Sequence, residues 1–232
     1  MSAAVASEPL TRSVEDYLKA IYQLSPEGRA ASTSEIANLL ALSAPSVTGM
    51  VKRLSEHGLL EHIPYRGVQL TEEGRRAALR MVRRHRLIEA YLVEFLGYSW
   101  DTVHEEAERL EHAVSDTMIE RMAGALGNPS VDPHGDPIPA ADGSIHEPTC
   151  IALSDVPVGE TVEISRVHES QPERLRYIAS LGLKPGVQVT VVDRQPIDDL
   201  VTITVGGDRQ VVGRELGHAL RCSQSAAPGK RY

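Results

Sequence analysis

The chain has 232 residues and a formal net charge of −8, and hydrophobic residues make up 41% of it. This composition is that of a globular protein with one large domain or two to three small ones. There is no run of about eighteen apolar residues and no signal-like N-terminus, so we expect a cytoplasmic protein without a membrane span. The two cysteines, Cys150 and Cys222, form no CxxC pair, which argues against a disulfide framework or a thiolate zinc site, and both are expected to be buried.

Charge is distributed unevenly along the chain. Residues 43–86 contain nine Lys and Arg against four Glu, whereas residues 100–124 contain seven acidic residues against two Arg. The net negative charge alone would count against nucleic acid as a partner. A basic part followed by an acidic part instead suggests two different binding tasks.

The first seventy residues carry the signals of a winged helix-turn-helix. Apolar residues at helical spacing predict a first helix in VEDYLKAIYQL, opened by Ser13 and ending near Pro26. Ser32 and Glu35 form a capping-box pattern before IANLL, and Ser43 caps APSVTGMVKRLSEH after a tight turn. The runs LLEHI and GVQL flank good turn residues and predict a two-stranded wing.

The remaining two thirds of the chain predict helices and then strands. Thr71 is expected to cap a long helix that ends near Leu96, and helices should follow over about 100–113 and 115–126. The segment GNPSVDPHGDPIPAADGSIHEP is typical of a linker. Strands are then predicted in TVEISRV, QVTVVDRQ, LVTITVGG and RQVVG, with one helix in PERLRYIASLG, which together suggest a small β-barrel.

The helix that begins at Ala44 is suited to DNA recognition. An α-helix fits the major groove, where small polar side chains near its N-terminus reach base edges and Lys or Arg hold phosphates. An arginine at the wing tip can meet a phosphate or the minor groove. Each such residue has an ordinary alternative as a solvated or core side chain, but the ordered set predicts DNA binding. The predicted contacts are Ser43, Pro45, Ser46, Thr48, Lys52, Arg53 and Arg66.

The acidic stretch HEEAERLEH contains a strip of metal-ligand types. On a helix of about 100 degrees per residue, four of them share one sector beside the apolar face: His104, Glu108, Glu111 and His112. Crowded carboxylates repel one another there, so the strip is either a solvated acidic face or a cation site. His85 and Glu89 on the preceding helix have the spacing that lets two side chains bind one ion, or that of a plain surface contact. Asp16 on the first helix is by itself an ordinary first-turn carboxylate.

These motifs, in their order along the chain, closely resemble the diphtheria toxin repressor family of iron- and manganese-dependent transcriptional repressors. The resemblance covers about residues 12–140, and more loosely about 150–222. It implies a homodimer that binds palindromic operator DNA when a divalent metal is bound, and it implies no enzyme. The implied fold is mainly α with small β: a winged helix-turn-helix DNA-binding domain (1–73), a helical metal-binding and dimerisation domain (74–140), a linker (141–149), an SH3-like β-barrel (150–222) and a disordered tail (223–232).

The resemblance also implies ligand roles. His85, Glu89 and His104 fall on one metal site of the iron-type members, and the second site corresponds to Asp16, Glu108, Glu111 and His112. Iron-type members carry Met at the Asp16 position and Cys at the Glu108 position, whereas manganese-type members carry Asp and Glu. Carboxylates suit the hard Mn²⁺ ion, so Mn²⁺ is the expected cofactor, with Fe²⁺ as the second choice.

Two departures and two rival functions stay open. Lys19 stands where short manganese-type members carry a Glu, which favours two separated sites. Of the C-terminal residues, His168, Glu169 and Gln171 are all candidates for a further ligand. The rivals are a winged-helix regulator that senses an organic ligand, and a helical di-metal redox enzyme, which would have no use for a winged helix.

Overall fold

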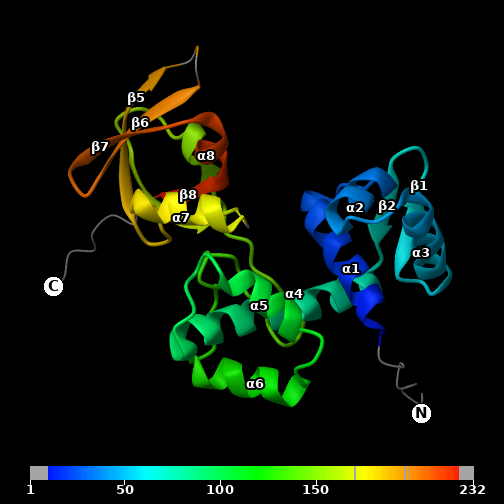
Figure 1. Ribbon diagram of the computed structural model, residues 1–232. Coiled ribbons are helices and arrows are strands. Elements are labelled where there is room, and N and C mark those ends of the chain that lie inside the picture. The colour runs from blue at the N-terminus through cyan, green and yellow to red at the C-terminus, as the bar shows by residue number, and fades with distance from the viewer. Residues whose placement is uncertain (1–9, 170, 196, 198, 225–232) are drawn as a thin grey trace. The chain divides into compact units, whose positions relative to one another are not determined.

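The computed structural model describes residues 10–169, 171–195, 197 and 199–224 (Figure 1). The chain divides into two compact units, Met1–Arg84 with Pro139–Ser144 and His85–Ile138 with Ile145–Tyr232. No helix within the described ranges has the length and apolarity that a membrane crossing requires.

The first unit is a winged helix-turn-helix, as the sequence predicts. Its elements are α1 (Arg12–Leu24), a 3₁₀ turn (Pro26–Gly28), α2 (Thr33–Leu40), α3 (Ala44–Glu56), β1 (Leu60–Ile63), β2 (Gly67–Leu70) and the start of α4 (Glu72–Leu96). Strands β1 and β2 pair antiparallel, and one core joins the helices to the wing through Leu18, Ile36 and Val51. The expected start of α1 at Ser13 is wrong, because the N-cap is Thr11 and Ser13 lies inside the first turn.

Local chemistry fixes the two helices of the turn and the base of the wing. The capping box is present: the Ser32 hydroxyl accepts from the Glu35 amide at 3.2 Å, and the Glu35 carboxylate accepts from the Ser32 amide at 2.9 Å. Ala31 and Val68 exchange two backbone hydrogen bonds of 2.8 and 2.9 Å. Gly67 (φ +122°) is required beside them, since a Cβ there would lie 2.1 Å from the Ala31 carbonyl oxygen. The wing is thereby attached to the segment before α2.

The second unit begins with the C-terminal half of α4, followed by α5 (Val103–Leu110) and α6 (Asp116–Ala125). These helices pack around a core that includes Leu87, Ile88 and Ile119. Helix α5 is shorter than expected, because it ends at Leu110 with Glu111 as its C-cap. Glu111 and His112 therefore occupy a turn and do not continue the helical strip.

Antiparallel strands form the C-terminal part of the second unit, with the order β3-β8-β4-β5-β6-β7. The elements are β3 (Ile151–Ala152), a 3₁₀ turn (Leu153–Asp155), β4 (Thr161–Val167), α7 (Pro172–Ser180), β5 (Gln188–Gln195), β6 (Leu200–Val205), β7 (Asp208–Val212), α8 (Arg214–Ala219) and β8 (Leu220–Gln224). Its core includes Cys222, which is buried as expected, whereas Cys150 is half-buried. The described strands leave β3 and β7 as edges, so the sheet is SH3-like in content without closing into a barrel.

The ends of this part differ from expectation. Strand β8 includes Ser223 and Gln224, which pair with Glu163 and Val162 on β4, so the first two residues of the expected tail belong to the sheet. Polar and apolar residues do not alternate there, so the sequence does not indicate a strand. Pairing with β4 extends β8 to Gln224. The rest of the expected tail, residues 225–232, lies outside the described residues.

The segment expected to be a simple linker is partly buried. Within it, Asp132, His134 and Ile138 are at most 8% exposed. Gly135 (φ +85°) lies so close to β4 that a Cβ would be 2.0 Å from the Ser165 carbonyl oxygen, and the Val167 amide donates to the His134 carbonyl at 2.8 Å. The segment therefore docks the sheet against the helical part of its unit.

Candidate metal centre

Two imidazoles and a carboxylate meet where α4 packs against α5. His85 Nε2 lies 3.0 Å from His104 Nδ1, and Glu89 Oε1 lies 2.9 Å from the first nitrogen and 3.0 Å from the second. Donor atoms that share one metal ion with bonds of 2.0–2.2 Å are themselves about 3 Å apart. The ring nitrogens and the carboxylate oxygen thus already have the spacing of a shared coordination sphere.

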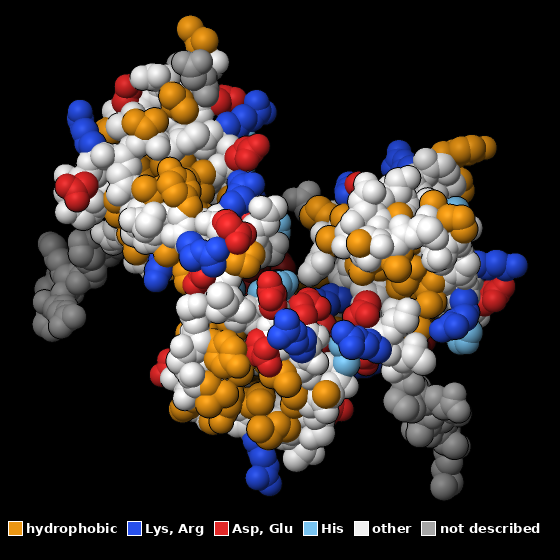
Figure 2. Space-filling view, in the orientation of Figure 1, with side chains coloured by type: hydrophobic (Ala, Val, Ile, Leu, Met, Phe, Trp, Pro, Cys, Tyr) orange, Lys and Arg blue, Asp and Glu red, His pale blue; other side chains and the backbone are white. Residues whose placement is uncertain are grey.

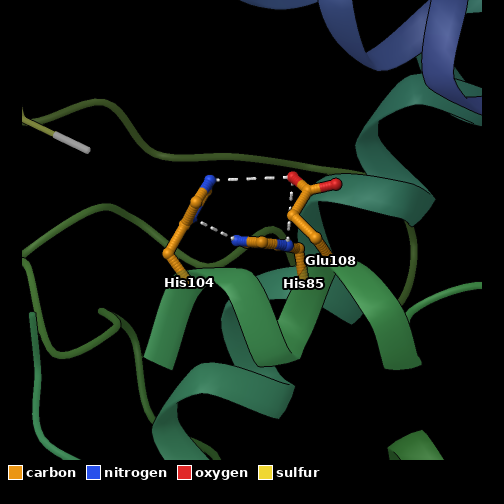
Figure 3. A group of neighbouring side chains, drawn as sticks. All are labelled: His85, His104 and Glu108. Carbon is orange, nitrogen blue, oxygen red and sulfur yellow. Dashed lines mark hydrogen bonds and ion pairs between the residues drawn. The ribbon is translucent and has the colours of Figure 1, made fainter. Parts of the chain in front are cut away.

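Glu108 completes this group from the next turn of α5. Its Oε1 lies 3.7 Å from His104 Nε2 and 3.8 Å from His85 Nδ1, and Figure 3 shows the three side chains pointing toward one another. His85, His104 and Glu108 each offer a ligand atom within 4.8 Å of the others. The i,i+4 spacing of His104 and Glu108 on α5 and the tertiary contact with α4 together create the group. Glu108, which the resemblance assigns to the other site, therefore lies against the histidine pair.

Glu111 orients His85 from the C-terminal end of α5. Its fully buried carboxylate lies 2.6 Å from His85 Nδ1, while Nε2 of the same ring faces Glu89. An N–H at Nδ1 donated to a carboxylate fixes the tautomer and leaves Nε2 available to a cation. Glu111 Oε1 also lies 3.5 Å from His112 Nε2. The turn after α5 thus supplies an orienting carboxylate, a role that the helical strip did not predict.

Electrostatics favours an ionised Glu89 in spite of its burial. Burial acts to raise the pKa of Glu89, but the charge of His85 and hydrogen bonds from His104, His134 and His85 outweigh it and hold that pKa well below its ordinary value. A buried carboxylate is ionised only where positive charge or donors compensate the lost hydration. A negative charge facing several imidazoles is suited to a cation, which would replace the protons between them.

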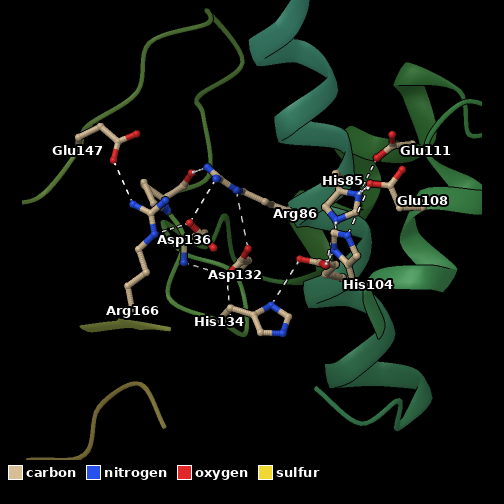
Figure 4. Close-up of polar contacts among 12 residues, drawn as sticks. His85, Arg86, His104, Glu108, Glu111, Asp132, His134, Asp136, Glu147 and Arg166 are labelled. Atoms are coloured by element: carbon tan, nitrogen blue, oxygen red, sulfur yellow. Dashed lines mark hydrogen bonds and ion pairs between the residues drawn. The ribbon is translucent and has the colours of Figure 1, made fainter. Parts of the chain in front are cut away.

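The structure shows a second group that the sequence interpretation missed. Glu89, Asp132 and His134 are all buried, and their ligand atoms lie within 4.8 Å of one another. His134 Nε2 donates to the Trp100 carbonyl at 2.7 Å, so Nδ1 faces Glu89 Oε2 at 3.7 Å. Figure 4 shows Asp132 and His134 lying beside His85 and His104. The signal available in the sequence is the Asp-Pro-His of residues 132–134, which lies inside the segment predicted to be a linker.

The charges of this second group are interdependent. Burial, followed by the charges of Asp136 and Glu89, raises the pKa of Asp132 to about 7. Burial acts to lower the pKa of His134, but its hydrogen bond and charge interaction with Glu89 and the charge of Asp132 raise it to about 9. Two buried carboxylates held close together favour either a proton or a cation between them. Arg86, whose Nε lies 3.8 Å from Asp132, supplies part of that positive charge.

The remaining predicted ligands are less defined. Asp16 lies half-buried on α1 in the first unit, whereas the other six lie in the second unit. In the C-terminal part, His168 and Gln171 are exposed. The Glu169 carboxylate accepts from the Gln171 amide at 3.0 Å and pairs with Arg174 at 2.6 Å. A role for Glu169 as a ligand would require it to exchange Arg174 for the cation.

The predicted DNA contacts all lie in the first unit. All of them are exposed, on α3 and on the wing: Ser43, Pro45, Ser46, Thr48, Lys52, Arg53 and Arg66. Figure 2 shows Lys or Arg side chains at the outer edge of the α3 region, with an acidic side chain between them. Two hydroxyls also serve the helix itself, because Ser43 accepts from the Ser46 amide at 3.4 Å and Thr48 donates to the Ala44 carbonyl at 2.9 Å. Tyr65 at the wing tip has φ +62° and is fully exposed.

Comparison with known proteins gives a consistent result along the chain. Residues 9–68 match the family described as the iron-dependent repressor N-terminal DNA-binding domain, residues 71–140 its metal-binding and dimerisation domain, and residues 151–223 the FeoA domain. The iron-dependent repressor IdeR of Mycobacterium leprae is 32% identical, with 91% of this chain and 97% of that protein covered. The diphtheria toxin repressor of Corynebacterium efficiens is 33% identical over 91% and 95%. A solved manganese-dependent transcriptional repressor in complex with manganese is 39% identical, covers 91% and 99%, and superposes with a TM-score of 0.85.

Proposed function

Because the chain belongs to the diphtheria toxin repressor family and is a metal-dependent, DNA-binding transcriptional repressor, we propose that it responds to Mn²⁺ and represses metal-uptake genes. Its domains indicate operator DNA and a second copy of the chain as partners, and no enzymatic activity. We further propose that the operator is palindromic, so that two α3 helices of a two-fold dimer read equivalent half-sites.

The ligand chemistry is the observation that supports manganese. Within the described residues, the groups able to hold an ion offer imidazole nitrogens and carboxylate oxygens, and none includes a cysteine sulfur. Mn²⁺ is hard and binds weakly in the divalent series, so a site without soft ligands suits it. The solved relative whose title names manganese supports the same choice, while the curated iron-dependent relatives keep Fe²⁺ as the alternative.

Regulation follows from ligands on two parts of the chain. A bound divalent cation supplies the positive charge that lets crowded carboxylates come together. We propose that Asp16 on α1 joins Glu108, Glu111 and His112 at one site, which requires the Glu108 and Glu111 carboxylates to turn from His85 toward the ion, while His85, Glu89 and His104 form the other. Asp16 would then fix the winged helix relative to the dimer axis, and a tenfold gain in operator affinity requires only about 1.4 kcal/mol of coupling.

The proposal is tested by operator binding under controlled metal. A suitable probe is a duplex selected by the Mn²⁺-treated protein from a random-sequence pool. We expect chelation with EDTA to lower affinity for this duplex at least about tenfold without loss of helical circular dichroism, and Mn²⁺ to restore it. Binding that is indifferent to EDTA would support the organic-ligand alternative. Restoration by Fe²⁺ under anaerobic conditions, but not by Mn²⁺, would make the manganese assignment wrong.

Single ligand replacements test the proposed site. Asp16→Ala and Glu108→Ala should each weaken the Mn²⁺-dependent increase in operator affinity by about tenfold or more. Each change removes one carboxylate from a weakly bound ion, and a neutral water is a poorer ligand than the carboxylate that it replaces. The measurement is a titration of operator binding with Mn²⁺. Glu105→Ala is the matched control, since Glu105 lies on α5 and is exposed. Equal Mn²⁺ titrations for Asp16→Ala and the unmodified protein would exclude Asp16 from the site.

A further inference from the structure

The outward face of α3 has a glycine at its centre. Gly49 is exposed in the interior of the helix, opposite the buried Val47 and Val51. At about 100 degrees per residue, the residues three and four positions away are its surface neighbours. They are Pro45, Ser46, Lys52 and Arg53, all of which are exposed and belong to the predicted DNA contacts.

The fold does not require a glycine at this position. Gly49 has no positive φ, and a Cβ built there would meet no atom within 4 Å. Gly67 and Gly74 are different, since a Cβ on either would lie 2.1 Å from a backbone oxygen. Glycine in a helix interior is less stable than alanine because it loses more backbone entropy on folding. Gly49 therefore weakens α3 without a compensating contact inside the molecule.

We propose that Gly49 is a specificity-determining residue for operator recognition, where the missing side chain lets the α3 backbone approach the base edges closely. This inference rests on the proposed use of α3 as the recognition helix and assigns a role to a residue outside the predicted contact set. Glycine permits close backbone approach to a ligand, and a helix that enters deeper brings short side chains such as Ser46 within reach of the bases. Lys52 and Arg53, which are exposed on α3 beside Gly49, can still contact phosphates.

Gly49→Ala should change folding and DNA binding in opposite directions. The thermal unfolding midpoint should rise by about 2 to 4 °C, as expected for a Gly→Ala change in a helix interior of a chain this size. Affinity for the selected duplex should fall at least about tenfold, the usual effect of one lost base contact, while affinity for a random-sequence duplex should stay within twofold. If Gly49 had only a structural role, the unfolding midpoint and the affinity for the selected duplex would not change in opposite directions.

Gly124→Ala is the matched control. Gly124 is also helical and exposed, on α6, with no atom within 4 Å of a built Cβ. It should raise the unfolding midpoint by a smaller amount, because Gly124 lies in the last turn of α6, and leave both duplex affinities unchanged. A second variant, Gly49→Gln, followed by selection from the random pool, should yield a sequence altered at one position in each half-site.

The outcomes separate this inference from the function it rests on. If the unmodified protein selects a duplex and binds it in a metal-dependent way, but Gly49→Ala binds that duplex equally well, the role of Gly49 is wrong and the proposed function stands. An unchanged selected sequence for Gly49→Gln would also overturn it. If the unmodified protein selects no duplex at all, the proposed function and this inference fail together.

Discussion

Replacement of Glu89 by Gln should lower the free energy of unfolding of the metal-free protein by about 3 kcal/mol, the usual effect of removing one partner from a buried charge pair. Glu89 is 2% exposed and contacts His85, His104 and His134. A glutamine keeps the shape but not the charge, so the facing imidazoles lose their common counter-charge. Because Glu89 belongs to both groups of potential ligands, stabilisation by added Mn²⁺ should be mostly lost as well.

The pH dependence of this difference follows from the direction of the pKa shifts. The pKa of Glu89 is held below 4.5, so its contribution is present above pH 4.5 and is lost as the pH falls through the lower folded value. The pKa of His134 is raised from 6.5 to about 9, so the stabilisation from its pairing with Glu89 is complete below pH 6.5 and is lost as the pH rises through about 9. The difference in unfolding free energy between Glu89→Gln and the unmodified protein should therefore be largest between about pH 4.5 and pH 6.5.

Thermal denaturation of metal-free protein between pH 4 and pH 9 checks this prediction. Glu94→Gln is the matched control, because Glu94 lies on the same helix and is exposed. It should change the unfolding midpoint little at any pH, as surface substitutions usually do. If Glu89→Gln proved as stable as the unmodified protein near pH 6, the histidine pair would not depend on Glu89 for its charge balance.

Gly135→Val should lower the thermal unfolding midpoint by about 5 to 10 °C, because its side chain would clash with β4 and push the segment away from the strand. A Cβ at this position would lie 2.0 Å from the Ser165 carbonyl oxygen on β4, and φ is +85°. The neighbouring hydrogen bond from the Val167 amide to the His134 carbonyl could not form at 2.8 Å with the segment displaced. Hydrogen exchange at the Val167 amide should accelerate accordingly.

Gly143→Val separates the close contact from backbone strain. Gly143 has φ +83°, but a Cβ there would meet no atom within 4 Å. It should show the smaller loss that a positive φ causes for a β-branched residue, and leave the Val167 amide protected. Equal effects of the two replacements would mean that strain alone, and not docking of the segment on β4, makes Gly135 necessary.

The starts of α2 and α3, the wing and the types of ligand were predictable because they depend on local chemistry. Ser32 with Glu35, and Ser43, mark helix starts through hydrogen bonds between residues that are close in the sequence. The i,i+4 pair of His85 and Glu89 is likewise a property of one helix. The chemical type of the ligands, imidazole and carboxylate without sulfur, follows directly from the residue types.

The assembly of those ligands depended on contacts between segments far apart in the chain. Only packing of α4 against α5 brings His104 and Glu108 to His85, and only the turn after Leu110 places the Glu111 carboxylate on His85. Asp132 and His134 had no periodicity to mark them, and they became buried because the Gly135 turn docks on β4. The open sheet, too, was decided by which strands pair. The sequence by itself thus determined caps, turns and donor types, whereas burial and the joining of donors into groups required the tertiary structure, because they arise from the exclusion of water by elements distant in sequence.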